Sequence, residues 1–284
     1  MSSTFGARLR DSLDRFGPLC VGIDPHAALL DAWGLTQDAA GVREFSLRVV
    51  DAAAGTAGVV KPQVAFYEQF GSAGFAVLEE TLAAARAAGL LTIADAKRGD
   101  IGSTMAGYAS AWLSPGSPLE ADSLTISPYL GPESLRETLL SAVRADKGVF
   151  VLAATSNPEA GALQTALTVD VAAEEGQTVA QRVARDVGWI NRSDAFAGTL
   201  GPIGLVIGAT VDRDEVGLPD EVLTGAPILA PGFGAQGAVP EDLRARFGAV
   251  SGNVLANESR SLLTDGIAGL SERMAAAAAR YRKV

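Results

Sequence analysis

The chain is poor in the side chains that most often bind metals or act as activated nucleophiles. Its 284 residues include one cysteine, Cys20, and one histidine, His26. A zinc site needs several such ligands, so the composition excludes one, and a nucleophile–histidine pair would have to use His26. A lone cysteine forms no intramolecular disulfide, which fits a reducing compartment, and we expect Cys20 to be a buried core thiol. Acid–base chemistry must therefore use carboxylates and lysines.

The chain also lacks basic runs and long apolar runs. Its 23 Lys and Arg stand against 33 Asp and Glu, a formal net charge of −10, so we expect no nucleic-acid partner. No apolar segment is long enough to cross a bilayer, and residues 1–17 lack the hydrophobic region of a signal peptide. We therefore expect a cytoplasmic protein with no membrane partner.

What the chain does contain is a repeated alternation of short apolar runs and helical segments. This order predicts a single (β/α)8 TIM barrel over residues 1–284, with a short N-terminal lead-in helix over 5–16. An open doubly wound sheet is the alternative, but the first strand is not followed by the glycine fingerprint typical of that fold. We expect a loop over 159–175 and one final helix over 261–281. The expected strands are 18–23, 58–60, 90–94, 122–126, 148–153, 203–207, 228–230 and 254–256.

One stretch, LLTIADAKRGDIGSTMAGY over residues 90–108, is unlike an ordinary strand and loop. Its apolar run ends in four charges, Asp95, Lys97, Arg98 and Asp100. Asp95 and Lys97 are two residues apart, so they share one face of an extended chain. A structural salt bridge at a strand end is one interpretation. Alternating charges flanked by glycines favour an active site, because buried charges are costly unless they are partnered.

Other polar residues also follow the predicted strands. In a TIM barrel the active site lies at the C-terminal ends of the strands, so these side chains should converge. The glycines of residues 231–237, PGFGAQG, allow backbone amides to approach an anion, and Arg260 can bind a phosphate through two parallel hydrogen bonds. A glycine-rich turn beside a surface arginine is the structural alternative. The residues at strand ends are Asp24, Lys61, Asp95, Lys97, Asp100, Ser156, Gln236 and Arg260.

The string DAKRGDIGSTMAGYA, residues 95–109, resembles the signature of the orotidine 5′-phosphate decarboxylases, in the longer-chain branch of that family. Further segments are similar to the family's strand ends and occur in the family's order. The chain differs at Phe233, where the family more often has Val, and at Ala238, where it has a second Gly. Residues 159–200 match weakly. The similar segments are GIDPH, VVKPQVAFYE, TSNP, PGFGAQG and the Ser-Arg of NESR.

The resemblance implies decarboxylation of orotidine 5′-monophosphate (OMP) to UMP, without metal or organic cofactor. It makes Lys97 the proton donor, with Asp95 and Asp100 flanking it and Lys61 holding Asp95. It also implies a homodimer with shared active sites, in which Asp100 and Thr104 reach the partner's pocket. The implied substrate contacts are Asp24 to the ribose, Gln236 and Arg260 to the phosphate, Ser156 and Pro231 to the pyrimidine, and Ile101 and Thr104 at the pocket wall.

Two alternatives remain from the sequence. A Mg²⁺-dependent sugar-phosphate decarboxylase or aldolase shares Asp-x-Lys-x-x-Asp on the same barrel, but such enzymes place a carboxylate where Lys61 stands. A lysine there repels a divalent ion. The second alternative is a non-catalytic barrel that binds phosphorylated nucleotides. Such a protein gains nothing from burying Lys97 between two carboxylates.

Overall fold

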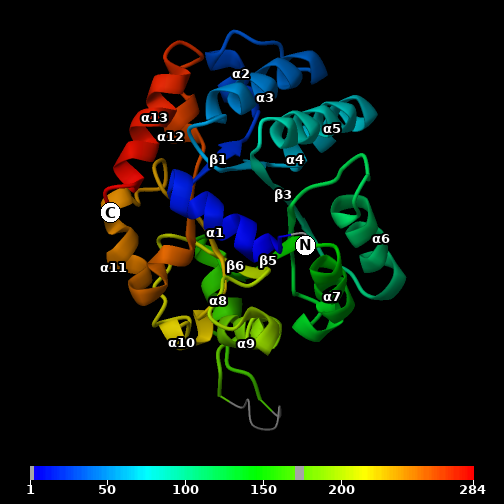
Figure 1. Cartoon of the computed structure of the whole chain (residues 1–284), viewed down its shortest axis with the longest axis vertical. Coiled ribbons are helices and arrows are strands. Elements are labelled where there is room, and N and C mark those ends of the chain that lie inside the picture. Colours follow the sequence, from blue (N-terminus) through cyan, green and yellow to red (C-terminus); the bar gives the residue numbers. More distant parts are fainter. Residues whose placement is uncertain (1–2, 170–175) are drawn as a thin grey trace.

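Parallel strands form a closed ring in which each strand pairs with its neighbours in the chain and β8 pairs with β1. The computed structural model describes residues 3–169 and 176–284. The ring confirms the predicted (β/α)8 barrel (Figure 1). The strands are β1 (Leu19–Ile23), β2 (Val59–Pro62), β3 (Leu91–Arg98), β4 (Ser123–Ile126), β5 (Gly148–Ala154), β6 (Ile203–Ile207), β7 (Ile228–Pro231) and β8 (Val254–Glu258).

Helices follow the strands and form the outer layer (Figure 1). The lead-in helix α1 has the predicted bounds. Within the described ranges, no helix combines the length and the apolar character needed to span a membrane. The helices are α1 (Phe5–Phe16), α2 (Ala27–Ala32), α3 (Ala39–Ala53), α4 (Ala65–Glu68), α5 (Gly71–Ala87), α6 (Gly102–Leu113), α7 (Arg136–Arg144), α8 (Gly161–Gln164), α9 (Val179–Gly188), α10 (Asp220–Leu223), α11 (Leu243–Phe247), α12 (Arg260–Leu263) and α13 (Leu270–Tyr281).

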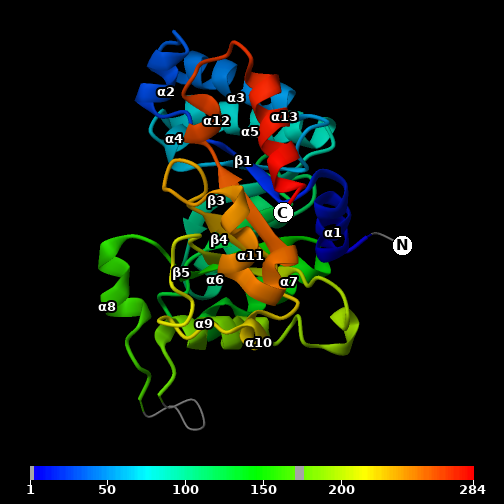
Figure 2. The same ribbon diagram turned by 90° about the vertical axis from the view of Figure 1, so that its left-hand side faces the viewer.

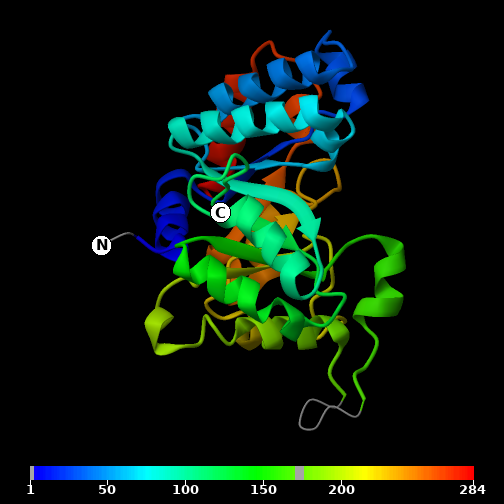
Figure 3. The same cartoon turned by 90° about the vertical axis from the view of Figure 1, so that its right-hand side faces the viewer.

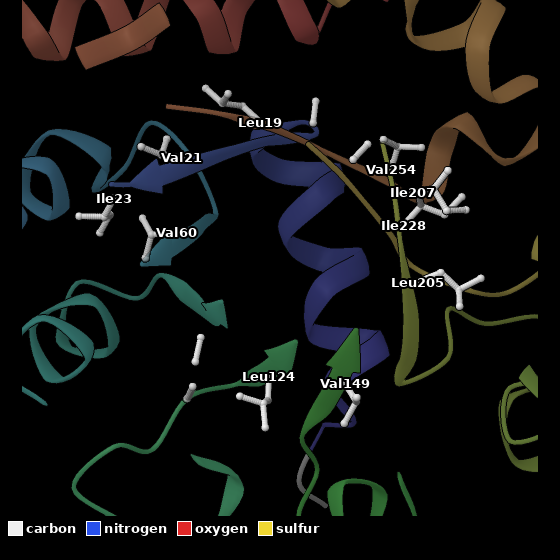
Figure 4. Packing of buried hydrophobic residues seen from close by; sticks show 14 of the residues in the cluster. Leu19, Val21, Ile23, Val60, Leu124, Val149, Leu205, Ile207, Ile228 and Val254 are labelled. Carbon is white, nitrogen blue, oxygen red and sulfur yellow. The ribbon is translucent and has the colours of Figure 1, made fainter. Parts of the chain in front are cut away.

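Strand side chains alternate between two apolar layers. Those that point out of the ring pack against the helices, and Figure 4 shows ten of them by name, including Val21 and Leu124. Those that point inward, such as Val59 and Leu255, form a second cluster that also contains Phe5 from α1. Cys20 belongs to this inner cluster, and burial raises the pKa of its thiol to about 12, so it is the buried core thiol expected.

The lead-in helix closes one end of the barrel. Phe5 packs edge-on against Phe150, with ring centroids 6.3 Å apart, next to Gly148 at the start of β5. Helix α1 therefore covers the N-terminal ends of the strands. Helix α8 and the loop after β7 lie at the opposite end (Figures 2 and 3). Apolar side chains and α1 fill the inside of the ring at the first end, so a ligand site in the barrel is expected at the second.

Most of the predicted strands differ from the observed ones by a residue or two at an end, and β3, the final helix and the segment after β5 differ more. Strand β3 continues to Arg98, so Asp95, Lys97 and Arg98 lie within the strand and Asp100 follows it. The expected final helix is broken into α12 and α13, because Gly266 and Gly269 between them adopt φ of 76° and 69°, outside the helical region. The expected loop over 159–175 contains the short helix α8, and its residues 170–175 lie outside the described part of the chain.

Candidate active site

Asp95 lies between two lysines at the C-terminal end of the barrel. Its Oδ2 is 2.7 Å from Lys61 Nζ, and its Oδ1 is 2.6 Å from Lys97 Nζ. All three side chains occupy inward positions, since Lys61 is two residues after the inward Val59, and Asp95 two after the inward Ile93. Asp95 therefore contacts Lys97, as their spacing suggested, and Lys61, as the family resemblance implied.

The backbone at Lys97 is in a conformation that lysine rarely adopts. Its φ is 48°, in the left-handed region, and the β3–β4 register shifts between Ala94 and Arg98. The amide of Lys97 donates to Thr125 Oγ1 at 2.9 Å, and this hydroxyl donates to Asp95 Oδ1 at 2.9 Å. Such strain costs on the order of 1–3 kcal/mol and occurs mainly at functional sites. Thr125 thus fixes both charged residues. Sequence reasoning missed it, although its inward position in β4 was a signal.

Neighbouring charges determine the protonation states of Asp95 and Lys61. Burial alone would raise the pKa of Asp95, but the Lys61 and Lys97 ammonium groups outweigh it and hold that pKa well below its usual range. Burial would lower the pKa of Lys61, yet the negative charges of Asp95 and Asp24 raise it above its ordinary value. Lys61 and Asp95 are therefore both charged at neutral pH. The side chain of Lys61 is 4% exposed and that of Lys97 is 45% exposed, so only Lys97 can meet a ligand freely.

Asp24 follows β1 at the same end of the barrel. Its Oδ1 is buried and has no hydrogen-bond partner in the part of the chain that the structure describes. A buried carboxylate oxygen without a donor is costly, so this atom is available to accept a hydrogen bond from a ligand. The hydroxyl of Ser259, after β8, is likewise buried without a partner there. Ser259 was not among the predicted site residues.

The residues predicted to bind a phosphate follow β7 and β8 at this end of the barrel. Glycines 232, 234 and 237 take φ of 118°, 71° and 101°, and the loop closes through a bond of 2.8 Å from the amide of Gly234 to the carbonyl of Ala238. Gln236 at its tip accepts a hydrogen bond of 3.4 Å from Ser156 after β5. Arg260 is exposed at the start of α12, and no ion pair of its guanidinium occurs within the described ranges.

Three predicted residues lie away from this cluster. Asp100 Oδ1 accepts a hydrogen bond of 2.8 Å from the amide of Ile101, and within residues 3–169 and 176–284 the Lys97 ammonium pairs with Asp95 alone. Ile101 is 59% exposed and Thr104 is exposed on α6. Arg98, the fourth charge of the stretch, pairs with Glu68 and lies 5.6 Å from the ring centre of Tyr108.

A buried carboxylate held between two lysines, at the C-terminal mouth of a closed parallel barrel, defines a TIM-barrel enzyme site that works with charged side chains. Within the described ranges, no group of three or more His, Cys, Asp or Glu is arranged to hold a metal ion. The family model described as the orotidine 5′-phosphate decarboxylase / HUMPS family matches residues 17–264. The chain belongs to this family.

Individual relatives are similar along nearly the whole chain. A Corynebacterium efficiens protein is 50% identical over 266 residues, covering 94% of this chain and 92% of its own. A Streptomyces coelicolor protein is 50% identical over 262 residues, covering 92% and 90%. Both are named orotidine 5′-phosphate decarboxylase. A solved structure from Streptomyces avermitilis, which carries the same name provisionally, is 48% identical with a TM-score of 0.90, covering 100% of this chain and 96% of its own. These findings confirm the predicted family and, with it, the decarboxylase activity.

The Asp95→Asn variant tests the two ion pairs that Asp95 forms with Lys61 and Lys97. It leaves the buried Lys61 ammonium without its partner, so we expect the free energy of unfolding to fall by about 3–5 kcal/mol at pH 7. Because the pKa of Asp95 is depressed in the folded state, the stability it contributes is complete above its unfolded pKa of about 3.9 and is lost as the pH falls through the folded value. The difference between the two proteins should therefore shrink below about pH 4.

Urea unfolding followed by circular dichroism between pH 3.5 and pH 8 measures this difference. Asp14→Asn is the control. The Asp14 side chain is 66% exposed, and its ion pair with Arg10, one helical turn away, is long at 3.5 Å. It should change the free energy of unfolding little at any pH. A stability difference for Asp95→Asn that stayed constant down to pH 3.5 would contradict the assigned charge state.

Proposed function

We propose that the protein converts OMP to UMP and CO2 in pyrimidine synthesis, with Lys97 as the proton donor. Loss of CO2 leaves an electron pair on an sp² ring carbon that no π-system delocalises. A cation beside that carbon stabilises the charge and then supplies a proton to it. The observation that carries the proposal is the pair of lysines on one carboxylate, of which only Lys97 is open to a ligand, at 45% side-chain exposure.

Each remaining residue has a place around this step. Asp95 orients the Lys97 ammonium through the 2.6 Å contact, and Lys61 compensates the charge of Asp95 inside the barrel. The substrate carboxylate binds beside the Asp95 carboxylate, and the repulsion between them eases as CO2 leaves. The unpartnered oxygen of Asp24 accepts a hydrogen bond from a ribose hydroxyl. No step in this scheme requires a metal ion or an organic cofactor.

The phosphate of the substrate binds at the other side of the mouth. Arg260 and Gln236 hold it together with amides of the glycine loop, and Ser156 and Pro231 contact the pyrimidine. The 3.4 Å bond between Ser156 and Gln236 supports this arrangement, because it brings together the loops after β5 and β7. Binding energy from the phosphate, remote from the reacting carbon, lowers the barrier by ordering these loops.

We further propose a homodimer in which Asp100, Ile101 and Thr104 complete the partner's pocket. The Asp100 carboxylate bonds to its own following amide and does not reach Lys97. Beside it, Ile101, Tyr129 and Leu130 are 59%, 78% and 54% exposed. The ends of β3 and β4 are joined by a 2.7 Å bond from the Ser127 amide to the Arg98 carbonyl, so the segments that carry these side chains start side by side. Exposed apolar groups so placed favour an interface, and a two-fold interface is self-complementary.

We also propose that residues 1–284 form one barrel domain that works in the cytoplasm. The strand ring contains all strands from β1 to β8, and Phe5 of α1 packs inside it at the N-terminal ends of the strands. Cys20, the only cysteine of the sequence, is buried and free, which fits a reducing compartment.

Variants of Lys97 and Arg260 should separate chemistry from binding. Lys97→Ala removes a charge that acts mainly in the transition state, so OMP turnover should be lost while UMP still binds. Arg260→Ala removes a ground-state contact, so UMP binding should weaken by about tenfold to a hundredfold, the scale of a charge-assisted hydrogen bond. The ultraviolet absorbance change of OMP measures turnover, and calorimetry measures UMP binding. Arg48→Ala, on the outer helix α3, is the control. Near-normal turnover of Lys97→Ala would refute the mechanism.

Removal of metal ions tests the alternative Mg²⁺-dependent chemistry. The family name covers a second group besides the decarboxylases, but the Lys61 ammonium occupies a site where a divalent ion would be repelled. We expect exhaustive EDTA treatment to leave OMP turnover unchanged in the same absorbance assay. A loss of turnover that Mg²⁺ restores would favour the sugar-phosphate alternative.

Mixing two inactive variants tests the shared site. After complete subunit exchange between Lys97→Ala and Asp100→Ala proteins, half of the dimers are mixed, and each mixed dimer has one intact site. We expect about a quarter of wild-type activity if the sites act independently. Native mass spectrometry verifies the mixed dimers. If they form and the activity stays at zero, Asp100 serves its own chain.

A further inference from the structure

Glu258, the last residue of β8, is a buried carboxylate that the proposed chemistry does not use. Its neighbour Asn257 points into the barrel and donates to the carbonyl of Cys20 at 3.1 Å, so Glu258 points outward, toward the helices. Glu258 is only 6% exposed, yet within the described ranges it forms no ion pair. The Arg280 guanidinium, which pairs with Glu241, acts on Glu258 only from beyond ion-pair distance. A buried carboxylate without a contacting counter-charge is costly, so it needs another explanation than stability.

Two hydroxyl groups hold this carboxylate. Tyr281 Oη donates to Oε1 at 2.5 Å, and Ser261 Oγ donates to Oε2 at 2.6 Å. Tyr281 comes from the C-terminal helix α13 and is 2% exposed. Burial, followed by the Glu258 charge, raises the pKa of Tyr281, so its hydroxyl keeps the proton that it donates. The carboxylate thus ties β8, α12 and α13 together at one point.

The same three side chains support the glycine loop after β7. A Cβ on Gly234 would lie 2.2 Å from Ser261 Oγ and 3.0 Å from Glu258 Oε2, so the loop backbone rests directly on this pair. The ring of Phe233 packs edge-on against Tyr281, with centroids 5.9 Å apart, and Phe233 is 3% exposed. The loop that carries Gln236 therefore packs against Glu258, Ser261 and Tyr281.

The cluster also lies next to Arg260. This arginine is the residue between Ser259 and Ser261, so the bond from Ser261 to Glu258 fixes the backbone that directs the guanidinium. Two groups that bind the phosphate in the proposed function, Gln236 and Arg260, are thus positioned by one buried carboxylate. Neither needs to touch it.

We propose that Glu258, Ser261 and Tyr281 are positioning residues for the phosphate end of the substrate, and that helix α13 thereby takes part in substrate binding. This inference rests on the proposed function of Arg260 and Gln236 as phosphate ligands. It predicts an effect that depends on the phosphate group and is absent for a ligand without one. A purely structural cluster would not make that distinction.

The Tyr281→Phe variant removes the hydroxyl and keeps the ring on Phe233. We expect it to raise the KM for OMP and the inhibition constant of UMP about tenfold, equivalent to about 1.4 kcal/mol, while the inhibition constant of uridine is unchanged. Ser261→Ala should act in the same direction. Tyr67→Phe is the matched control, because it removes another buried tyrosine hydroxyl, 2.8 Å from Ser46 Oγ, away from this loop. Its ratio of UMP to uridine inhibition should equal that of the wild type.

Arg260→Ala in the same assay distinguishes the proposed phosphate site from the positioning role of the Glu258 cluster. If it leaves UMP inhibition unchanged, the proposed phosphate site is wrong and the positioning role falls with it. If Arg260→Ala weakens UMP but Tyr281→Phe and Ser261→Ala do not, only the positioning role is wrong. An equal loss of UMP and uridine binding in Tyr281→Phe also overturns it, since the cluster would then serve the fold as a whole.

Discussion

The carboxylate of Asp95, held between the ammonium groups of Lys61 and Lys97, is the interaction on which the site depends. A charged side chain inside a barrel is tolerated only with a partner, and Asp95 has two at 2.7 Å and 2.6 Å. The two lysines are not equivalent. Lys61 is enclosed and balances the carboxylate, whereas Lys97 extends to the mouth. The buried cation balances the carboxylate, and the exposed one faces the mouth of the barrel.

The barrel makes this arrangement possible through its alternation of side chains. Apolar inward residues and α1 fill the ring at the N-terminal ends of the strands. Inward polar side chains of the site lie at the C-terminal ends. Thr125 on β4 then fixes the irregular end of β3, where Lys97 has a left-handed backbone and the register shifts. A regular strand would place Lys97 by pleat alone. The bulge gives it a position that the neighbouring strand determines.

Much of this was predictable because strand order and period are properties of the sequence. The apolar runs predicted every strand of the ring, and the polar residues near their ends correctly placed Asp24, Lys61, Asp95 and Lys97 at one end of the barrel. The charged end of β3 was assigned to a loop, because a strand that carries charges contradicts the rule of buried apolar runs until their partners are known. The break between α12 and α13 was also missed, since the Ala-rich segment after it has high helical propensity. Thr125 and Tyr281 required tertiary contacts, which spacing alone does not reveal.

The register of β8 against β1 determines which of its last two side chains points into the barrel. Asn257 points inward to the carbonyl of Cys20, and Glu258 points outward to Tyr281. A shift of one residue would exchange them, placing an uncompensated carboxylate inside the ring and removing the support of the glycine loop. The register of β8 against β1 is therefore constrained from both faces. Because Arg260 follows two residues later, the strand that closes the barrel also determines where the proposed phosphate-binding group stands.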